Sequence, residues 1–211
     1  MLVKEDVVAE QKDFFNKKHY SFCLFSGINT ESIKPLVELL KNIEENSILD
    51  LYINSRGGYV LVAIGIFNLI KTIKKIEINT YNLGHCDSAA TLLFLLGKKR
   101  IAIKNSTFFM HSLQINFTQP QTINSLNMEI QKLKTDTNTM ISLLANNSSL
   151  TKKEWSMLMS DKGNLIKARK ALAIGIVDNI FEGKDIKLLV EKKKSNGNHY
   201  SNNHNRFFIF Y

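Results

Sequence analysis

Along most of the chain, hydrophobic and polar positions follow either a pattern typical of β-strands or one typical of α-helices. Short apolar runs of strand length at 20–26, 49–53 and 76–82 are each followed, after a polar turn, by a segment with apolar residues at helical spacing. In the first of these helices, capped at Asn29, the apolar positions are Ile33, Leu36, Leu39, Leu40 and Ile43. Strands alternating with helices predict βαβ units around a mainly parallel sheet, the α/β class.

Further turns, helices and short strands are predicted along the rest of the chain. Polar turns are expected at 54–58 and 83–87, each opening a helix, at 59–74 and 88–96. Short strands follow at 100–103 and 107–110, a polar loop at 114–121, and a long amphipathic helix at 123–146. The remaining elements are two helices and a closing strand, at 149–159, 167–174 and 176–180.

Length and composition favour one folded domain with flanking segments. With 211 residues, 44% of them hydrophobic, the chain can bury a sizeable core. We expect an N-terminal segment at 1–18, a domain at 19–190 and a basic, disordered tail at 191–211. No apolar run reaches the length of a membrane span or a signal peptide core, which predicts a soluble protein without a membrane partner.

Charge and cysteine content exclude several function classes. The net charge of +9 is spread over helix ends, a turn and the tail rather than one basic helix, so we expect no nucleic-acid partner. Cys23 and Cys86 have no metal-ligand spacing, which indicates reduced thiols, no metal site and a reducing compartment. A GxxxxGK[ST] phosphate-binding loop does not occur in the sequence.

Candidate chemistry gathers where three predicted strands end. Gly57 and Gly58 open one helix and Ser88 opens the next, so two helix N-termini present amide donors near one hydroxyl. His111 ends a strand, and a histidine base is what a serine nucleophile needs. The alternatives are an N-cap role for Ser88 and a hydrogen-bonded strand-end role for His111.

Three motifs resemble a known family. "LYINSRGGYVLVAIGIFNLI", "GHCDSAATLLFLLGKKRIAIKNSTFFMHS" and "ALAIGIVDNI" occur in the order and at the separations of the Clp protease proteolytic subunit (ClpP) family, over roughly residues 20–181. The resemblance implies a crotonase-like ββα superhelix with a protruding handle, at about 112–147, through which rings of seven dock face to face. It implies Ser88 as nucleophile, His111 as general base, and the amides of Gly58 and Ala89 as oxyanion donors.

The third catalytic residue is the open point of the resemblance. The family has an aspartate at a fixed distance before the residue that matches Ala171 and after the residue that matches His111. Counting back from Ala171 gives Gly163 as its position, whereas counting forward from His111 gives Ser160. A two-residue insertion reconciles both counts and selects Asp161, whose alternative role is that of an N-cap or surface acid. Arg56 and Asp87 replace the proline and alanine usual in the family, and a carboxylate at Asp87 affects either His111 or the oxyanion.

The resemblance implies a serine endopeptidase that cleaves unfolded polypeptides inside an oligomeric chamber, with no cofactor of its own. ATP would be used only by an AAA+ unfoldase partner, in the cytoplasm or an organelle stroma or matrix. The rings would be homomeric or shared with paralogous subunits, and a double ring would hold fourteen chains. A catalytically silent assembly subunit and a crotonase-type acyl-CoA enzyme are the alternatives.

Overall fold

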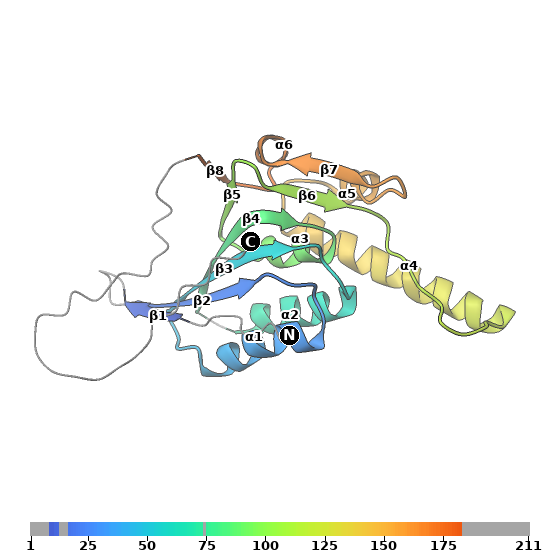
Figure 1. The fold of residues 1–211 in the computed structure, drawn as a ribbon, viewed down its shortest axis with the longest axis horizontal. Coiled ribbons are helices and arrows are strands. Elements are labelled where there is room, and N and C mark those ends of the chain that lie inside the picture. Colours follow the sequence, from blue (N-terminus) through green and yellow to red (C-terminus); the bar gives the residue numbers. More distant parts are fainter. Residues whose placement is uncertain (1–8, 13–16, 74, 183–211) are drawn as a thin grey trace, which may run out of the picture.

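The computed structural model describes residues 9–12, 17–73 and 75–182 of the chain. In this part, a central sheet has the strand order β1-β2-β3-β4-β5-β8 (Figure 1). β2, β3, β4, β5 and β8 run parallel, and β1 pairs antiparallel with β2. The bounds are β1 Ala9–Lys12, β2 Lys18–Leu24, β3 Ile48–Ser55, β4 Glu77–Cys86, β5 Lys99–Ile103 and β8 Asn179–Phe181. The mixed α/β class with a parallel sheet is therefore confirmed.

Helices bury one face of this sheet. α1 (Thr30–Asn42) and α2 (Val60–Thr72) lie side by side below β2 and β3 in Figure 1. Alternate side chains of β3 point into this core, because the two faces of a strand alternate; Leu49, Leu51 and Ile53 are at most 3% exposed. The short helix α3 (Ala89–Phe94) is completely buried along its length. This core holds the loops after the strands in fixed positions.

On the edge away from β3, β4 divides its pairing between two neighbours, and this division brings the ends of several strands together. Its residues Asn79–Asn82 pair with β5, whereas His85 pairs with β6 (Thr107–Met110). The Asn82 side chain also donates a 2.8 Å hydrogen bond to the Thr107 carbonyl. β6 in turn pairs antiparallel with β7 (Asn164–Lys167). As a result, the carboxyl ends of β3, β4 and β6 lie next to one another.

The long helix α4 (Ile123–Asn146) has the bounds that the sequence predicted, and Figure 1 shows it projecting from the body of the molecule. A capping box between Thr122 and Ser125 starts it. Its exposed apolar residues are concentrated in the outer half, at Ile123, Leu126, Met128 and Ile130. α5 (Lys152–Leu158) and α6 (Ala168–Ala173) complete the fold near β7.

One predicted turn is wrong, and two strands were not predicted. The turn expected at 83–87 is mostly strand, because β4 continues to Cys86 through pairing of Ser55 with Cys86 and of His85 with Thr107. β1 and β7 were not expected from their polar sequences, and both form by antiparallel pairing with a neighbour. The remaining predicted helices and strands are present, with ends shifted by a few residues.

Several expectations concern residues outside the described part of the chain. Most of the N-terminal segment and the whole tail at 191–211 are among them, and the division into segments stays a prediction. Within the described ranges, none of the helices combines the length and apolar character that crossing a bilayer requires.

Candidate active site

The turn after β3 contains two consecutive glycines, of which Gly57 is buried and Gly58 exposed. Gly57 and Gly58 have φ values of 86° and 149°, which residues with a Cβ rarely adopt. The Gly57 amide donates a 3.1 Å hydrogen bond to the Ser55 hydroxyl, and the Gly57 carbonyl accepts one of 2.7 Å from Ile28. Gly58 is exposed. The turn is thus fixed from both sides at Gly57, while Gly58 faces outward.

Ser88 lies in a sharp turn between β4 and α3. Only Asp87 and Ser88 separate the strand from the helix, and Ser88 has φ 51° and ψ −123°. This conformation costs about 1–3 kcal/mol for a residue with a side chain, so it persists only where the surroundings enforce it. Strained strand-to-helix turns of this kind present a nucleophile at the top of a sheet. The Ser88 side chain makes no capping hydrogen bond, which argues against the N-cap role.

The glycine turn and the Ser88 turn are packed directly together. A Cβ placed on Gly57 would lie 2.6 Å from the Asp87 carbonyl and 3.0 Å from the Ser88 Cβ. The Asp87 amide donates a 3.0 Å hydrogen bond to the Ser55 carbonyl, which joins the two turns through the main chain. Gly57 is therefore required by close approach as well as by its φ.

His111 follows β6 immediately, as the sequence predicted. Its Nδ1 lies 2.6 Å from the Ser112 carbonyl oxygen, and because a carbonyl only accepts, Nδ1 carries the proton. In the neutral ring, Nε2 then has the free lone pair that a general base needs. The ring also stacks on Phe109 at 5.7 Å between centroids. Both contacts fix the orientation of the imidazole.

Ser88 and His111 open onto one cavity of about 620 Å³. Arg56 and Gly58 from the glycine turn line it as well. Its apolar wall consists of Val60, Leu61, Leu113, Ile115 and Leu133. Glu129 and Lys132 of α4, which form a 2.6 Å ion pair, line it together with Asp136. The cavity can hold an apolar side chain beside the hydroxyl and the imidazole.

The two amides expected as oxyanion donors occupy different surroundings. Gly58 is an exposed residue that lines the cavity, whereas Ala89, the first residue of α3, is completely buried. The Ala89 nitrogen would lie 3.1 Å from a Cβ on Gly57, so the missing Cβ leaves space over this amide. Amides in the first turn of a helix have no acceptor within that helix. Their role as oxyanion donors stays a prediction.

Asp161 is not brought to His111 in this structure. Asp161 is exposed, and among the described residues no hydrogen bond or ion pair joins it to His111. The loop itself is close: the Ser112 amide donates a 3.3 Å hydrogen bond to the Ser160 carbonyl. The loop therefore approaches the base while the Asp161 carboxylate lies in solvent, and its catalytic role stays a prediction without geometric support.

Asp87 is the buried acid of the site. It is 9% exposed, and its Oδ1 has no hydrogen-bond partner among the described residues. Burial raises the pKa of the Asp87 carboxyl, whereas His85, the Phe109 amide, Arg56 and His111 act in the opposite direction. The His85 Nδ1 lies 3.8 Å from Asp87 Oδ2 and 3.2 Å from the Thr107 hydroxyl.

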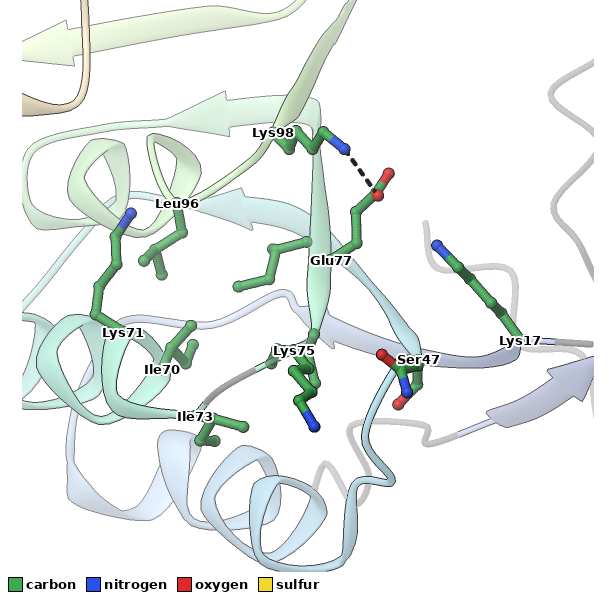
Figure 2. A pocket seen from close by; sticks show the side chains of 12 residues that line it. Lys17, Ser47, Ile70, Lys71, Ile73, Lys75, Glu77, Leu96 and Lys98 are labelled. Atoms are coloured by element: carbon green, nitrogen blue, oxygen red, sulfur yellow. Dashed lines mark hydrogen bonds and ion pairs between the residues drawn. The ribbon is translucent and has the colours of Figure 1, made fainter.

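A second cavity, of about 380 Å³, lies at the opposite ends of the strands and carries a different set of side chains. Lys17, Lys71, Lys75 and Lys98 line it, together with an apolar floor that includes Ile70 and Leu96 (Figure 2). Figure 2 shows Lys98 paired with Glu77 at 3.0 Å. Its lining contains no histidine, and the Ser47 hydroxyl is hydrogen-bonded to the Glu44 carbonyl. It therefore offers no serine–histidine pair.

The described residues offer neither a metal site nor a second nucleophile at the turn. No group of three histidine, cysteine, aspartate or glutamate side chains lies close enough in the described ranges to share a metal ion. Cys86, two residues before Ser88, is completely buried, and this burial raises the pKa of its thiol well above the ordinary value. A buried thiol with a raised pKa is a poor nucleophile, so Ser88, which lines the cavity, is the candidate nucleophile.

Fold and site together define a class of protein: a parallel α/β fold in which a strained serine and a histidine share a cavity at the carboxyl ends of neighbouring strands. The Clp protease family model matches residues 15–184. The chain therefore belongs to the Clp protease family.

Individual relatives agree with this family. ATP-dependent Clp protease proteolytic subunit 1 of Corynebacterium glutamicum is 27% identical over 151 residues, which is 71% of each chain. Proteolytic subunit 2 of Mycobacterium tuberculosis is 23% identical over 183 residues, covering 82% of this chain and 84% of that protein. Among solved structures, a ClpP1 mutant from Listeria monocytogenes superposes with a TM-score of 0.67 at 22% identity, covering 78% of this chain and 92% of that one. This last likeness establishes the fold.

One functional group at the site was not predicted from the sequence. The acceptor of the His111 Nδ1 proton is the main-chain carbonyl of Ser112. Every residue has a carbonyl, so no residue type marks this role. The buried state of Asp87 was also not foreseen, although its unusual place before Ser88 was visible in the sequence.

Proposed function

We propose that this protein is a serine endopeptidase of the Clp type, with Ser88 as nucleophile and His111 as general base. The observation that carries the proposal is that one cavity is lined both by a strained, uncapped Ser88 and by a His111 ring whose Nδ1 proton is held by the Ser112 carbonyl. The free Nε2 is then the nitrogen that accepts the Ser88 proton. Membership in the Clp protease family supports the same reaction.

The reaction follows from these groups. The Ser88 oxygen attacks the peptide carbonyl while His111 takes the hydroxyl proton, and the developing oxyanion accepts hydrogen bonds from the Gly58 and Ala89 amides. Each such donor typically contributes about 3 kcal/mol to a tetrahedral intermediate. His111 then protonates the leaving amine, and water hydrolyses the acyl-enzyme through the same base.

The shape of the site supports an extended polypeptide as substrate. Gly58 exposes a main-chain edge next to Ser88, and an extended peptide pairing with such an edge is recognised through its backbone. The apolar wall formed by Val60, Leu61, Leu113, Ile115 and Leu133 favours an apolar side chain next to the cleaved bond. We expect broad selectivity with a preference for apolar residues at that position.

The proposal includes assembly and an external source of energy. The exposed apolar residues on the outer half of α4 suit a contact between copies of the chain, in heptameric rings stacked in pairs. Enclosure would admit short peptides, whereas folded proteins would require an ATP-dependent unfoldase. Relatives named ATP-dependent Clp protease proteolytic subunits support this partnership.

The experiment compares peptidase activity and native mass before and after Ser88→Ala. We expect the assembled wild-type protein to cleave a short fluorogenic peptide, and Ser88→Ala to lose at least about a thousandfold in kcat/KM with unchanged mass. The matched control is Ser112→Ala, which retains the carbonyl that holds His111 and should retain activity. Equal turnover by wild type and Ser88→Ala would refute the serine mechanism.

A silent assembly subunit is the second candidate, and one observation favours it. His111 has no hydrogen bond to a carboxylate among the described residues, since Asp161 lies in solvent. In that case the protein would form rings of normal mass, but these rings would cleave no peptide in the absence of an active paralogue.

A further inference from the structure

We infer that Phe109 is a positioning residue for His111, and that Gly163 leaves the space that the Phe109 ring occupies. The inference rests on the proposed function, because it concerns how the base is held for its reaction with the nucleophile. Gly163 and Ser160, the two positions to which the spacing counts lead, carry no carboxylate, and Asp161 is exposed to solvent. The groups that contact His111 in the structure are a carbonyl and an aromatic ring.

Strand geometry places Phe109 and His111 on the same side of the chain. β6 ends at Met110, and its residues Phe108 and Met110 are completely buried in the core, whereas Phe109 is 36% exposed. Side chains alternate between the two faces of a strand, so residues two apart share a face. The rings of Phe109 and His111 are stacked, with 5.7 Å between their centroids and 30° between their planes. The strand thus sets the Phe109 ring against one face of the imidazole.

The stack and the Nδ1 hydrogen bond restrict different motions of the imidazole. Turning the ring over about its Cβ–Cγ bond would break the 2.6 Å contact between Nδ1 and the Ser112 carbonyl. Tilting the ring plane would break the contact with Phe109, and stacked aromatic pairs resist such a change. His111 lines the cavity, whereas Phe109 is not among the described residues that do so. Phe109 therefore acts on the base without contacting a substrate in that cavity.

Gly163 completes the packing around Phe109. The register of β6 and β7 ends with Met110 opposite Asn164, so His111 and Gly163 are the next residues beyond that pair. A Cβ on Gly163 would lie 2.4 Å from Cζ and 2.8 Å from Cε2 of Phe109, which is too close for two carbon atoms. Gly163 also has a φ of 67°, in the region that favours glycine. A side chain at this position would displace the ring that stacks on His111.

Main-chain hydrogen bonds hold the loop and the strand in this arrangement. The Ser160 carbonyl accepts from the Gly163 amide at 2.9 Å and from the Ser112 amide at 3.3 Å. Ser112 also accepts the Nδ1 proton of the base, so this one residue joins the base to the loop. The Ser88 amide donates to the Phe109 carbonyl at 2.7 Å. Phe109 is therefore connected to the nucleophile through its carbonyl and to the base through its ring.

Phe109→Leu tests the inference in the assembled protein, because leucine keeps an apolar side chain but has no ring to stack on His111. We expect kcat for a short fluorogenic peptide to fall about tenfold with KM unchanged, since the base is less well placed while the cavity is intact. The rate of Ser88 labelling by a fluorophosphonate probe should fall by the same factor, because labelling needs the base but no bound peptide.

The matched control is Phe25→Leu. Phe25 follows β2 directly and is 45% exposed, so its replacement removes a similar ring from the surface at a distance in the sequence from β6 and the base. We expect it to change neither rate. Native mass is measured for every variant. If Phe109→Leu fails to assemble, Phe109→Ile takes its place, because isoleucine also lacks the ring and favours strands.

Gly163→Ala shows whether the glycine acts through the ring. In the wild-type background the added Cβ pushes Phe109 away from His111, and kcat should again fall about tenfold. In the Phe109→Leu background the ring atoms Cζ and Cε2 are absent, so Gly163→Ala should lower kcat by less than about twofold. The strain from the φ of Gly163 is the same in both backgrounds and does not produce this difference.

Wild-type kcat and labelling rate in Phe109→Leu, or an equal loss from Gly163→Ala in both backgrounds, would overturn the inference and leave the serine mechanism intact. An assembled wild-type protein that neither cleaves the peptide nor takes the label would refute the proposed function and the inference together.

Discussion

The amide of Ser88 donates a 2.7 Å hydrogen bond to the carbonyl of Phe109, two residues before His111. This contact joins the turn that carries the nucleophile to the strand that carries the base, although the two come from different βαβ units. Since the Ser88 amide lies in a strained turn and Phe109 lies in a paired strand, neither can move independently of the other. The main chain thereby fixes the two positions from which the hydroxyl and the imidazole extend.

Replacing Gly57 by alanine is expected to disrupt this arrangement. The new Cβ would lie 2.6 Å from the Asp87 carbonyl, and the φ of 86° adds strain. We expect a loss of about 2–4 kcal/mol in the free energy of unfolding, measured by urea denaturation, and loss of peptidase activity.

Gly65→Ala is the matched control for this substitution. Gly65 lies within α2, and a Cβ there has no heavy atom within 4 Å. Alanine favours helix over glycine by about 1 kcal/mol, so this variant should be slightly more stable and fully active. Equal stability losses in the two variants would contradict the close packing of the two turns.

Asp178 is expected to contribute to stability through Arg100. Its carboxylate accepts hydrogen bonds from the Arg100 amide, Nε and Nη2 at 2.9, 3.2 and 2.6 Å, while Arg100 also donates to the Asn147 carbonyl. Asp178→Ala should therefore reduce the free energy of unfolding by about 1–3 kcal/mol without affecting the site. These contacts give Asp178, which lies in the closing motif "ALAIGIVDNI", a structural role.

Glu182→Gln provides the comparison for Asp178, again by urea denaturation. Among the described residues, Glu182 forms long, exposed ion pairs, at 3.9 Å to Lys104 and 3.8 Å to Arg169. Such pairs contribute about 0–1 kcal/mol, so the change should be smaller than for Asp178→Ala. The reverse order would show that the bidentate contact with Arg100 contributes little.

Asp87→Asn should change the pH dependence of stability. Burial raises the pKa of this carboxyl above its ordinary value, so the folded state holds the proton more tightly than the unfolded state. As pH rises above about 4, the unfolded state loses its proton first, and the wild type loses stability that the asparagine variant retains. The melting temperature of the variant should exceed that of wild type at pH 7 and approach it near pH 4. A difference that is constant with pH would show that the carboxyl does not titrate as described.

Local sequence was sufficient where periodicity and capping determine the structure. The bounds of α4 agree with the predicted helix at 123–146, because a capping box starts it and its apolar positions keep one face. β6 also agrees with the predicted strand at 107–110. The two glycines, Ser88 and His111 were located correctly because each follows a strand that is recognisable by itself.

The features that could not be predicted depend on contacts between residues that lie far apart in the sequence or on main-chain groups. Gly84 and His85 have the composition of a turn, yet they continue β4 because Cys86 pairs with Ser55 and His85 with Thr107. The partner of His111 is a main-chain carbonyl, which has no signal in the sequence. Spacing selected Asp161 as the third catalytic residue, which stays a prediction. Its loop lies near Ser112, but spacing carries no information on whether the Asp161 side chain points to the base or to solvent.

Labelling with a fluorophosphonate probe tests the central claim most directly, because the probe reacts only with a serine that an adjacent base has activated. The tryptic peptide 76–98 contains Ser88 as its only serine, so mass spectrometry of this peptide reports the adduct without ambiguity. We predict one adduct per chain on Ser88 in the assembled wild-type protein and none in His111→Gln. An assembled wild-type protein without any adduct on this peptide would contradict the assignment of Ser88 as an activated nucleophile.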